Sequence, residues 1–278
     1  MPSSFGAPGN LMGVSALNEL GIETSFFEYL IVGGPMMLAG ILYFALFGYK
    51  LLPKNSGAAS LEDDQFAVKD YSDVPKWKQY MSLAVLVIAI LAMVFEKQIG
   101  IKLQVSASVG AIILILTGVI SEKEALKSID LKTVFLFGGS LALATALEHT
   151  GAGSLIADTL IGAMGNEVHP LILLVVIFVI TCTMTNFMSN TATTALMVPI
   201  AVSLAQGLGA DPRAVVIATV IAGSCAYATP IGMPANTMVV GIGGYKFIDY
   251  VKAGLPLILV SFIICMVILP VAYPFFPA

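Results

Sequence analysis

The residues that could do chemistry in this sequence are uncharged and lie in the middle of strongly apolar stretches. The segment TCTMTNFMSNTATT, at 181–194, holds nine polar residues in fourteen, between the apolar arms LILLVVIFVI and ALMVPIAVSLA. The segment AYATPIGMPANTMVVG, at 226–241, interrupts another apolar stretch with two prolines, two glycines and an asparagine. Hydroxyl, amide and carbonyl oxygens suit a hard cation, and helix N-termini favour an anion. These two segments therefore predict ion binding.

Other kinds of chemistry have less support in the sequence. It offers no nucleophile–base pair and no cluster of metal ligands, so we do not expect an enzyme or a bound cofactor. The three cysteines, Cys182, Cys225 and Cys265, all lie within apolar segments and are expected to be buried small hydrophobic residues. The net charge of −4 is small and dispersed, which argues against a nucleic-acid partner.

The composition predicts an all-α polytopic membrane protein. Hydrophobic residues make up 58% of the chain, charged residues 11%, and the mean hydropathy is +0.95. A soluble domain carries about 25% charged residues. Several apolar runs reach or approach the roughly 20 residues that a helix needs to cross a bilayer. We expect a multi-pass protein of the plasma (cytoplasmic) membrane.

The beginning of the chain repeats the interrupted segment near its end. Four residues in each copy share their order and spacing: Gly6, Pro8, Asn10 and Met12 match Gly232, Pro234, Asn236 and Met238. After a five-residue difference in loop length, an aromatic residue, an acid, a tyrosine and Gly-x-Pro follow in both: Phe26, Glu28, Tyr29, Gly33 and Pro35 match Phe247, Asp249, Tyr250, Gly254 and Pro256. We interpret this as a true internal repeat.

The repeat divides the chain into three parts. Residues 1–53 are the tail of a first repeat, with a broken-helix loop and one transmembrane helix. Residues 54–80 form a polar cytoplasmic linker. Residues 81–278 are a complete second repeat, with a re-entrant hairpin at 170–206 and a broken helix at 213–243.

The hairpin is predicted from lengths. One helix over 170–206 would run about 55 Å, far beyond a hydrocarbon core of about 30 Å, whereas two full spans would need about 40 residues and a turn. A hairpin that enters and leaves on one side, with Ser189, Asn190 and Thr191 at its tip, fits this length. Irregular backbone at that depth is tolerated where protein or a water-filled cavity surrounds it.

The distribution of lysine and arginine supports this topology. Four full spans, at about 29–52, 81–95, 104–120 and 133–149, make the second broken helix run opposite to the first, which is an inverted repeat. With the linker in the cytoplasm, ten basic residues fall inside and three outside; a single crossing at 170–206 would give eight and five.

Inverted repeats with paired broken helices are typical of secondary transporters, whose binding site lies between the breaks. No Asp, Glu, Lys or Arg falls at the centre of any span, which favours sodium over protons as the coupling ion. The helix starts after Thr191 and at Thr237 are the candidates to face an anion.

At MSNTATTALMVPIA, ATPIGMPANTMVVG and YKFIDYVKAGLPL, the chain resembles the divalent anion:sodium symporter family of the ion transporter superfamily. The likeness covers nearly the whole chain. It implies two inverted repeats, each with a Ser-Asn-Thr hairpin and a broken helix, a homodimer, and an elevator-type movement that carries a small anionic substrate such as a dicarboxylate or an inorganic oxyanion.

The resemblance also implies roles for individual residues. The residues expected to contact substrate are Ser189, Asn190, Thr191, Thr229 and Pro230. The sodium ligands are expected from Thr185, Asn190 and the backbone of Ala228. The two loops are expected to be formed by Ser3, Ser4, Gly6, Pro8 and Asn10 in the first repeat, and by Gly232, Pro234 and Asn236 in the second.

Two departures from the family pattern leave alternatives open. Ser3 and Ser4 stand where the family has Thr-Pro, and the hairpin of the first repeat would lie before Met1, so we expect the chain to be the C-terminal portion of a carrier that needs a missing N-terminal half. The alternatives are a non-transporting fragment or partner subunit, and an arsenite carrier or sodium/proton antiporter on the same scaffold.

Overall fold

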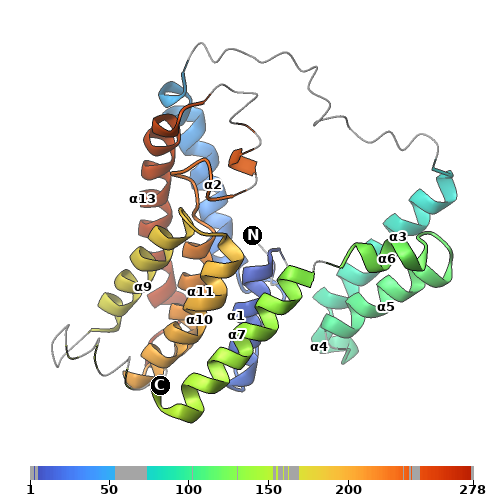
Figure 1. Cartoon of the computed structure of the whole chain (residues 1–278), viewed down its shortest axis with the longest axis horizontal. Helices are drawn as coiled ribbons and strands as arrows, with labels where there is room; N and C mark the ends of the chain where they lie inside the picture. Colours follow the sequence, from blue (N-terminus) through green and yellow to red (C-terminus); the bar gives the residue numbers. More distant parts are fainter. Residues whose placement is uncertain are drawn as a thin grey trace. The chain divides into compact units, whose positions relative to one another are not determined.

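A computed structural model describes residues 3, 6–53, 74–101, 103–129, 131–152, 155, 159, 162, 169–233, 235–237, 239 and 245–276 (Figure 1). The described part is helical and contains no strand, as predicted for the fold class. It separates into two compact units, one formed by residues 1–61 with 133–278 and the other by residues 62–132.

The larger unit is built around helix α11 (Pro212–Gly223), whose residues are buried except for Arg213. Helices α9 (Pro170–Thr185) and α10 (Asn190–Gly207) pack against α11 and against each other (Figure 1). Helix α1 (Pro8–Glu19) packs on α10 and α11, while α2 (Leu30–Leu46) packs on α13 (Phe247–Ala272). A short 3₁₀ turn, η1 (Gly48–Leu51), follows α2, and this unit also takes in nearly all of α7 (Leu131–Thr150).

The helices of this unit start where the sequence provides caps. Proline opens α1, α9 and α11, where its missing N–H costs no hydrogen bond. Asp211 caps α11 by accepting the Arg213 N–H at 2.9 Å, and Ser189 caps α10 by accepting the Ala192 N–H at 3.2 Å. These local signals fix where α10 and α11 begin, and both starts matter for the site described below.

The smaller unit contains α3 (Lys76–Val94), α4 (Glu96–Ile99), α5 (Leu103–Leu116) and α6 (Glu122–Lys127), with α3 packed on α5. Helix α6 begins with a capping box, in which Ser121 and Glu124 each accept a backbone N–H of the other. The hydrogen bonds from Ser121 hold the pKa of the Glu124 carboxyl below its usual value. The charged stretch at 121–133 therefore starts with a short, exposed helix.

Two of the described helices, α3 and α13, are both long and apolar enough to cross a membrane; α2, α9, α11 and residues 105–116 are apolar but shorter. Several boundaries differ from the predicted spans, and α2 ends at Leu46, not at 52. Helix α5 ends at Leu116, not at 120, because Gly118 takes a positive φ of 71° and the Val119 N–H closes back on Leu114 O at 3.1 Å. Helix α3 begins at Lys76, inside the stretch predicted as linker; the rest of that linker, 54–73, lies outside the described residues.

Candidate functional site

The residues at 170–207 form two helices joined by a tight turn, so the chain reverses here. Helix α9 ends at Thr185, residues 186–189 make the turn, and α10 starts at Asn190. At the turn, Thr185 Oγ1 lies 2.8 Å from the side-chain oxygen of Asn190 and 2.5 Å from Gly223 O, the last residue of α11. The helix–turn–helix therefore touches the end of α11.

Helix α11 stops at Gly223, and the next ten residues, 224–233, are not helical. The side chain of Asn186 connects this break to the hairpin. Its Nδ2 donates to Cys182 O at 2.8 Å and Cys225 O at 3.3 Å, and its Oδ1 accepts the Ala228 N–H at 3.0 Å. The Asn186 carbonyl also accepts a hydrogen bond from Thr229 Oγ1 at 2.5 Å. Backbone groups freed by the break are thus satisfied by one asparagine.

Uncharged oxygens converge on the side chain of Asn190. With its Nδ2 turned toward the break, the amide donates to Gly232 O at 3.1 Å and Gly223 O at 3.3 Å. A half-turn of the amide puts Oδ1 there instead, beside the same two carbonyls and the hydroxyl of Thr185. The second orientation gathers oxygens from α9, α10 and the break around one point, which is an arrangement that can hold a hard cation.

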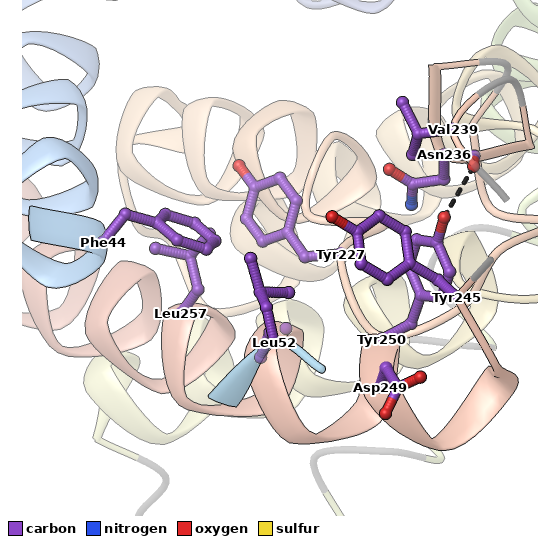
Figure 2. A pocket seen from close by; sticks show the side chains of 11 residues that line it. Phe44, Leu52, Tyr227, Asn236, Val239, Tyr245, Asp249, Tyr250 and Leu257 are labelled. Atoms are coloured by element: carbon purple, nitrogen blue, oxygen red, sulfur yellow. Dashed lines mark hydrogen bonds between the residues drawn. The ribbon is translucent and has the colours of Figure 1, made fainter. Parts of the chain in front are cut away.

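The second half of the break is closed by Asn236 and Thr229. Asn236 Nδ2 donates to Ala226 O and Thr229 O, both at 2.8 Å, and Thr229 Oγ1 accepts the Gly232 N–H at 3.1 Å. Tyr250, on α13, donates from its hydroxyl to Asn236 O at 2.8 Å (Figure 2). The chain becomes helical again at 235–237. The short helix was predicted to start at Thr237 and therefore starts earlier than predicted.

The loop at the start of the chain has the same hydrogen bonds. Asn10 Nδ2 donates to Ser3 O, seven residues earlier, at 2.7 Å, just as Asn236 reaches Thr229 O. Tyr29 donates to Asn10 O at 3.2 Å, as Tyr250 does to Asn236 O. The residues that carry these bonds are those that the sequence comparison paired.

Helix α1 brings the first loop next to the Ser-Asn-Thr segment. Thr194, whose hydroxyl donates to Asn190 O at 2.8 Å, lies between two glycines. A Cβ added to Gly9 would lie 3.1 Å from Thr194 Oγ1, and one added to Gly223 would lie 2.5 Å from it. Because Gly9 and Gly223 have no Cβ, α1 and α11 can both approach Thr194 of α10 closely.

The structure separates the predicted site residues into groups. Thr185, Asn190 and Gly232 meet at the oxygen cluster, and Ala228 reaches the hairpin through its N–H. Thr229 was predicted to touch substrate, but its side chain is 3% exposed and its hydroxyl is used inside the protein. Among the predicted site residues around the hairpin tip and the break, Ser189 is exposed, and partial exposure is found for Asn190, Thr191, Ala228 and Pro230.

Around the first loop, Gly6 is exposed, Pro8 opens α1, and the Gly6 N–H donates to Ser3 O at 3.0 Å. Two predicted site residues, Ser4 and Pro234, lie outside the described residues. Sequence reasoning missed Asn186 as the residue that ties the hairpin to the break. The available signal was its position as the first residue of the turn, directly after the predicted ligand Thr185.

Charged side chains do not contribute to the described interior. Tyrosines and cysteines apart, every buried polar side chain among the described residues is Asn, Ser or Thr. All three cysteines are buried and free, as predicted. No group of metal-binding His, Cys, Asp and Glu side chains occurs within the described residues. The candidate site therefore consists of neutral oxygens and amides.

Apolar helices, a hairpin of two helices and a broken helix that meets the turn of this hairpin are features typical of integral membrane transporters. The chain belongs to the citrate transporter family, which it matches over residues 1–222. This agrees with the resemblance to sodium-coupled anion carriers found in the sequence, and the predicted family is confirmed.

Several curated transporters are similar to the chain. A sodium-dependent dicarboxylate transporter, SdcS, from Staphylococcus aureus is 27% identical over 98% of the chain and 57% of its own length. An uncharacterized transporter of Haemophilus influenzae is 31% identical over 94% of the chain and 59% of its own length. The uncharacterized transporter YfbS of Escherichia coli is 36% identical over 56% of the chain and 25% of its own length. The chain thus spans between a quarter and three-fifths of these relatives.

Proposed function

We propose that the chain is part of a sodium-coupled secondary transporter of small divalent anions, either dicarboxylates or an inorganic oxyanion. The observation that carries this proposal is the oxygen cluster around Asn190, where Thr185 Oγ1, Gly223 O and Gly232 O lie 2.8, 3.3 and 3.1 Å from its amide. Neutral oxygens of this kind suit sodium, and SdcS, a relative over nearly the whole chain, is named as sodium-dependent.

In this proposal the Asn190 amide has two positions. Without an ion, its Nδ2 hydrogen-bonds Gly223 O and Gly232 O and draws the hairpin onto the break. With sodium bound, the amide turns and Oδ1 becomes a ligand beside the two carbonyls and Thr185. The same contacts thus hold the hairpin to the break with or without the ion, and only the atom supplied by Asn190 changes.

The anion is proposed to bind beside the cation, at the start of α10. Ser189, Asn190 and Thr191 form the first turn of this helix, whose N-terminus carries partial positive charge. The exposed surface of Ser189 and Pro230 is open to a ligand there. A sodium ion a few ångströms away would add to the attraction, which would couple anion binding to sodium.

We further propose that the paired loops belong to an inverted repeat, with the 54–80 linker on the cytoplasmic side of the plasma membrane and the complete carrier forming a homodimer. The hydrogen bonds shared by Asn10 and Asn236 support the repeat. The excess of basic residues assigned to the inside supports the orientation.

Binding of sodium to the purified chain tests the proposal. Thermal unfolding is measured in NaCl and in choline chloride at equal ionic strength, with succinate or sulfate added in parallel. Sodium at ten times its Kd is expected to stabilise the protein by about 1.4 kcal/mol. Asn190→Ala should lose this effect, whereas Asn18→Ala, at an exposed asparagine near the end of α1, should keep it.

Equal unfolding curves in NaCl and choline chloride would refute sodium as the coupling ion. Transport is measured on the complete carrier, as uptake of radiolabelled succinate or sulfate into proteoliposomes with and without a sodium gradient. Uptake of every anion at the same rate without sodium would rule out symport.

A further inference from the structure

A pocket lies between the end of α2, the start of α13 and the residues Tyr227 and Asn236 of the broken helix. It has a volume of about 360 Å³, within the range of small-molecule sites, which is about 300–1,000 Å³. Figure 2 shows Phe44 and Leu257 at one end and Asp249, Tyr245 and Tyr250 at the other. Most of the lining is therefore apolar, and the polar side chains of Asp249, Tyr245 and Tyr250 gather at one end.

The polar end has the composition of a site for an organic ammonium group. The rings of Tyr245 and Tyr250 stand at 86° to each other with their centroids 6.1 Å apart, and the carboxylate of Asp249 lies on the same lining. Aromatic faces attract ammonium groups through their quadrupoles, and a carboxylate adds a full negative charge. A headgroup that carries both an ammonium group and a phosphate fits this end best, because the ammonium group can face Asp249 and the phosphate can face Lys246, the N-cap of α13.

The surroundings of the pocket point to a lipid. Outside it, α2 and α13 expose large apolar side chains, among them Leu42 at 60% and Leu255 at 58%, as expected of lipid-facing helices. Lys50 and Lys246 stand at the ends of these two helices next to the pocket, and lysines and tyrosines are typical of the headgroup level of a bilayer. A molecule that enters the pocket from this side is therefore expected to be a phospholipid.

We propose that this pocket binds a phospholipid with an ammonium headgroup, such as phosphatidylethanolamine. The amine lies among Tyr245, Tyr250 and Asp249, and the start of an acyl chain lies along Phe44 and Leu257. Because the Tyr250 hydroxyl holds Asn236 O in the break, the bound lipid supports one wall of the broken helix. The lining does not include Thr185, Asn190, Gly223 or Gly232, the residues proposed to hold sodium, although Tyr227 and Asn236 of the break belong to it.

The test uses native mass spectrometry of the purified chain in detergent, with dioleoyl-phosphatidylethanolamine and dioleoyl-phosphatidylglycerol as probes. We expect the ethanolamine lipid to be retained about fivefold to tenfold more strongly. Tyr245→Leu and Asp249→Asn should each bring retention down toward that of the glycerol lipid. Asparagine keeps an oxygen for the Lys246 N–H, which Asp249 accepts at 2.8 Å, so the start of α13 is preserved.

Tyr49→Leu is the matched control, because this tyrosine is 56% exposed on η1 and does not line the pocket; it should retain the lipid as the unaltered chain does. Equal retention of both lipids, or full retention by Asp249→Asn, would overturn the proposal. If Tyr245→Leu does not fold, Asp249→Asn decides alone. The readout is lipid binding, so failure of sodium coupling would leave it unaffected.

Discussion

Replacing Gly254 by alanine should separate α13 from the break of the broken helix. A Cβ at this position would overlap the carbonyl of Tyr227 and lie 2.7 Å from Ala228 N, whereas ordinary contacts begin at 3.4 Å. The obstructing atoms are backbone, so no side chain can swing away, and α13 or the break has to move by roughly 1 Å. Overpacking of this kind costs about 1–3 kcal/mol.

Gly40→Ala is the matched control for this prediction. Gly40 lies in α2, the helix that packs on α13, and its added Cβ would meet only Leu257 Cδ1 at 3.8 Å, an ordinary contact. There the usual preference of a helix for alanine should stabilise the protein by about 0.5–1 kcal/mol.

Thermal unfolding of the two purified variants measures the difference. We expect Gly254→Ala to unfold at a lower temperature than the unaltered chain and Gly40→Ala at the same or a higher temperature. Gly254→Ala should also reduce the stabilisation by sodium, because one proposed ligand, Gly232 O, lies in the break and another, Gly223 O, lies directly before it. If Gly254→Ala is as stable as Gly40→Ala, the close approach of α13 to the break is refuted.

The remaining predictions concern single hydrogen-bonded groups. Asn186→Ala leaves the partly buried Ala228 N–H without its partner and removes the amide donor to the buried Cys225 O, which should cost about 2–4 kcal/mol in thermal unfolding; Thr183→Ala, an exposed control one helical turn earlier, should cost less than about 0.5 kcal/mol. Comparable losses in both variants would contradict a special role for the asparagine. Ser121→Ala removes the cap of α6 and should speed amide hydrogen exchange in that helix, by an amount that corresponds to about 1 kcal/mol; unchanged exchange would contradict the cap.

Much of the architecture could be predicted because the relevant signals are local. A stretch too long for one span and too short for two, with polar residues at its centre, predicted a reversal of the chain, and the structure has a turn at 186–189. Prolines and glycines predicted where α11 would give way to irregular chain. Both inferences depend on bilayer thickness and backbone hydrogen bonding, which act on any sequence.

The contacts inside the site could not be predicted in the same way, because they depend on how separate segments meet. Gly223 and Gly232 supply the carbonyls nearest the Asn190 amide. Every residue has a backbone carbonyl, so the sequence does not indicate which carbonyls face the site. Thr229 was predicted to contact substrate from its residue type and position, whereas the structure shows its hydroxyl donating to Asn186 O at the end of α9 and accepting the Gly232 N–H. The residue type indicated that Thr229 would form hydrogen bonds, and only the packing shows which groups are its partners.

The two loops also show which spacings are constrained. Asn10 and Asn236 each reach the carbonyl seven residues earlier, whereas the tyrosine that donates to each asparagine carbonyl lies 19 residues later in one loop and 14 in the other. The five-residue difference thus falls outside the stretch that the asparagine closes. Within that stretch every freed backbone group needs a partner at hydrogen-bond distance, and each one left without a partner in lipid costs several kcal/mol. An insertion is tolerated where the chain has already left the break, and excluded where the asparagine spans it.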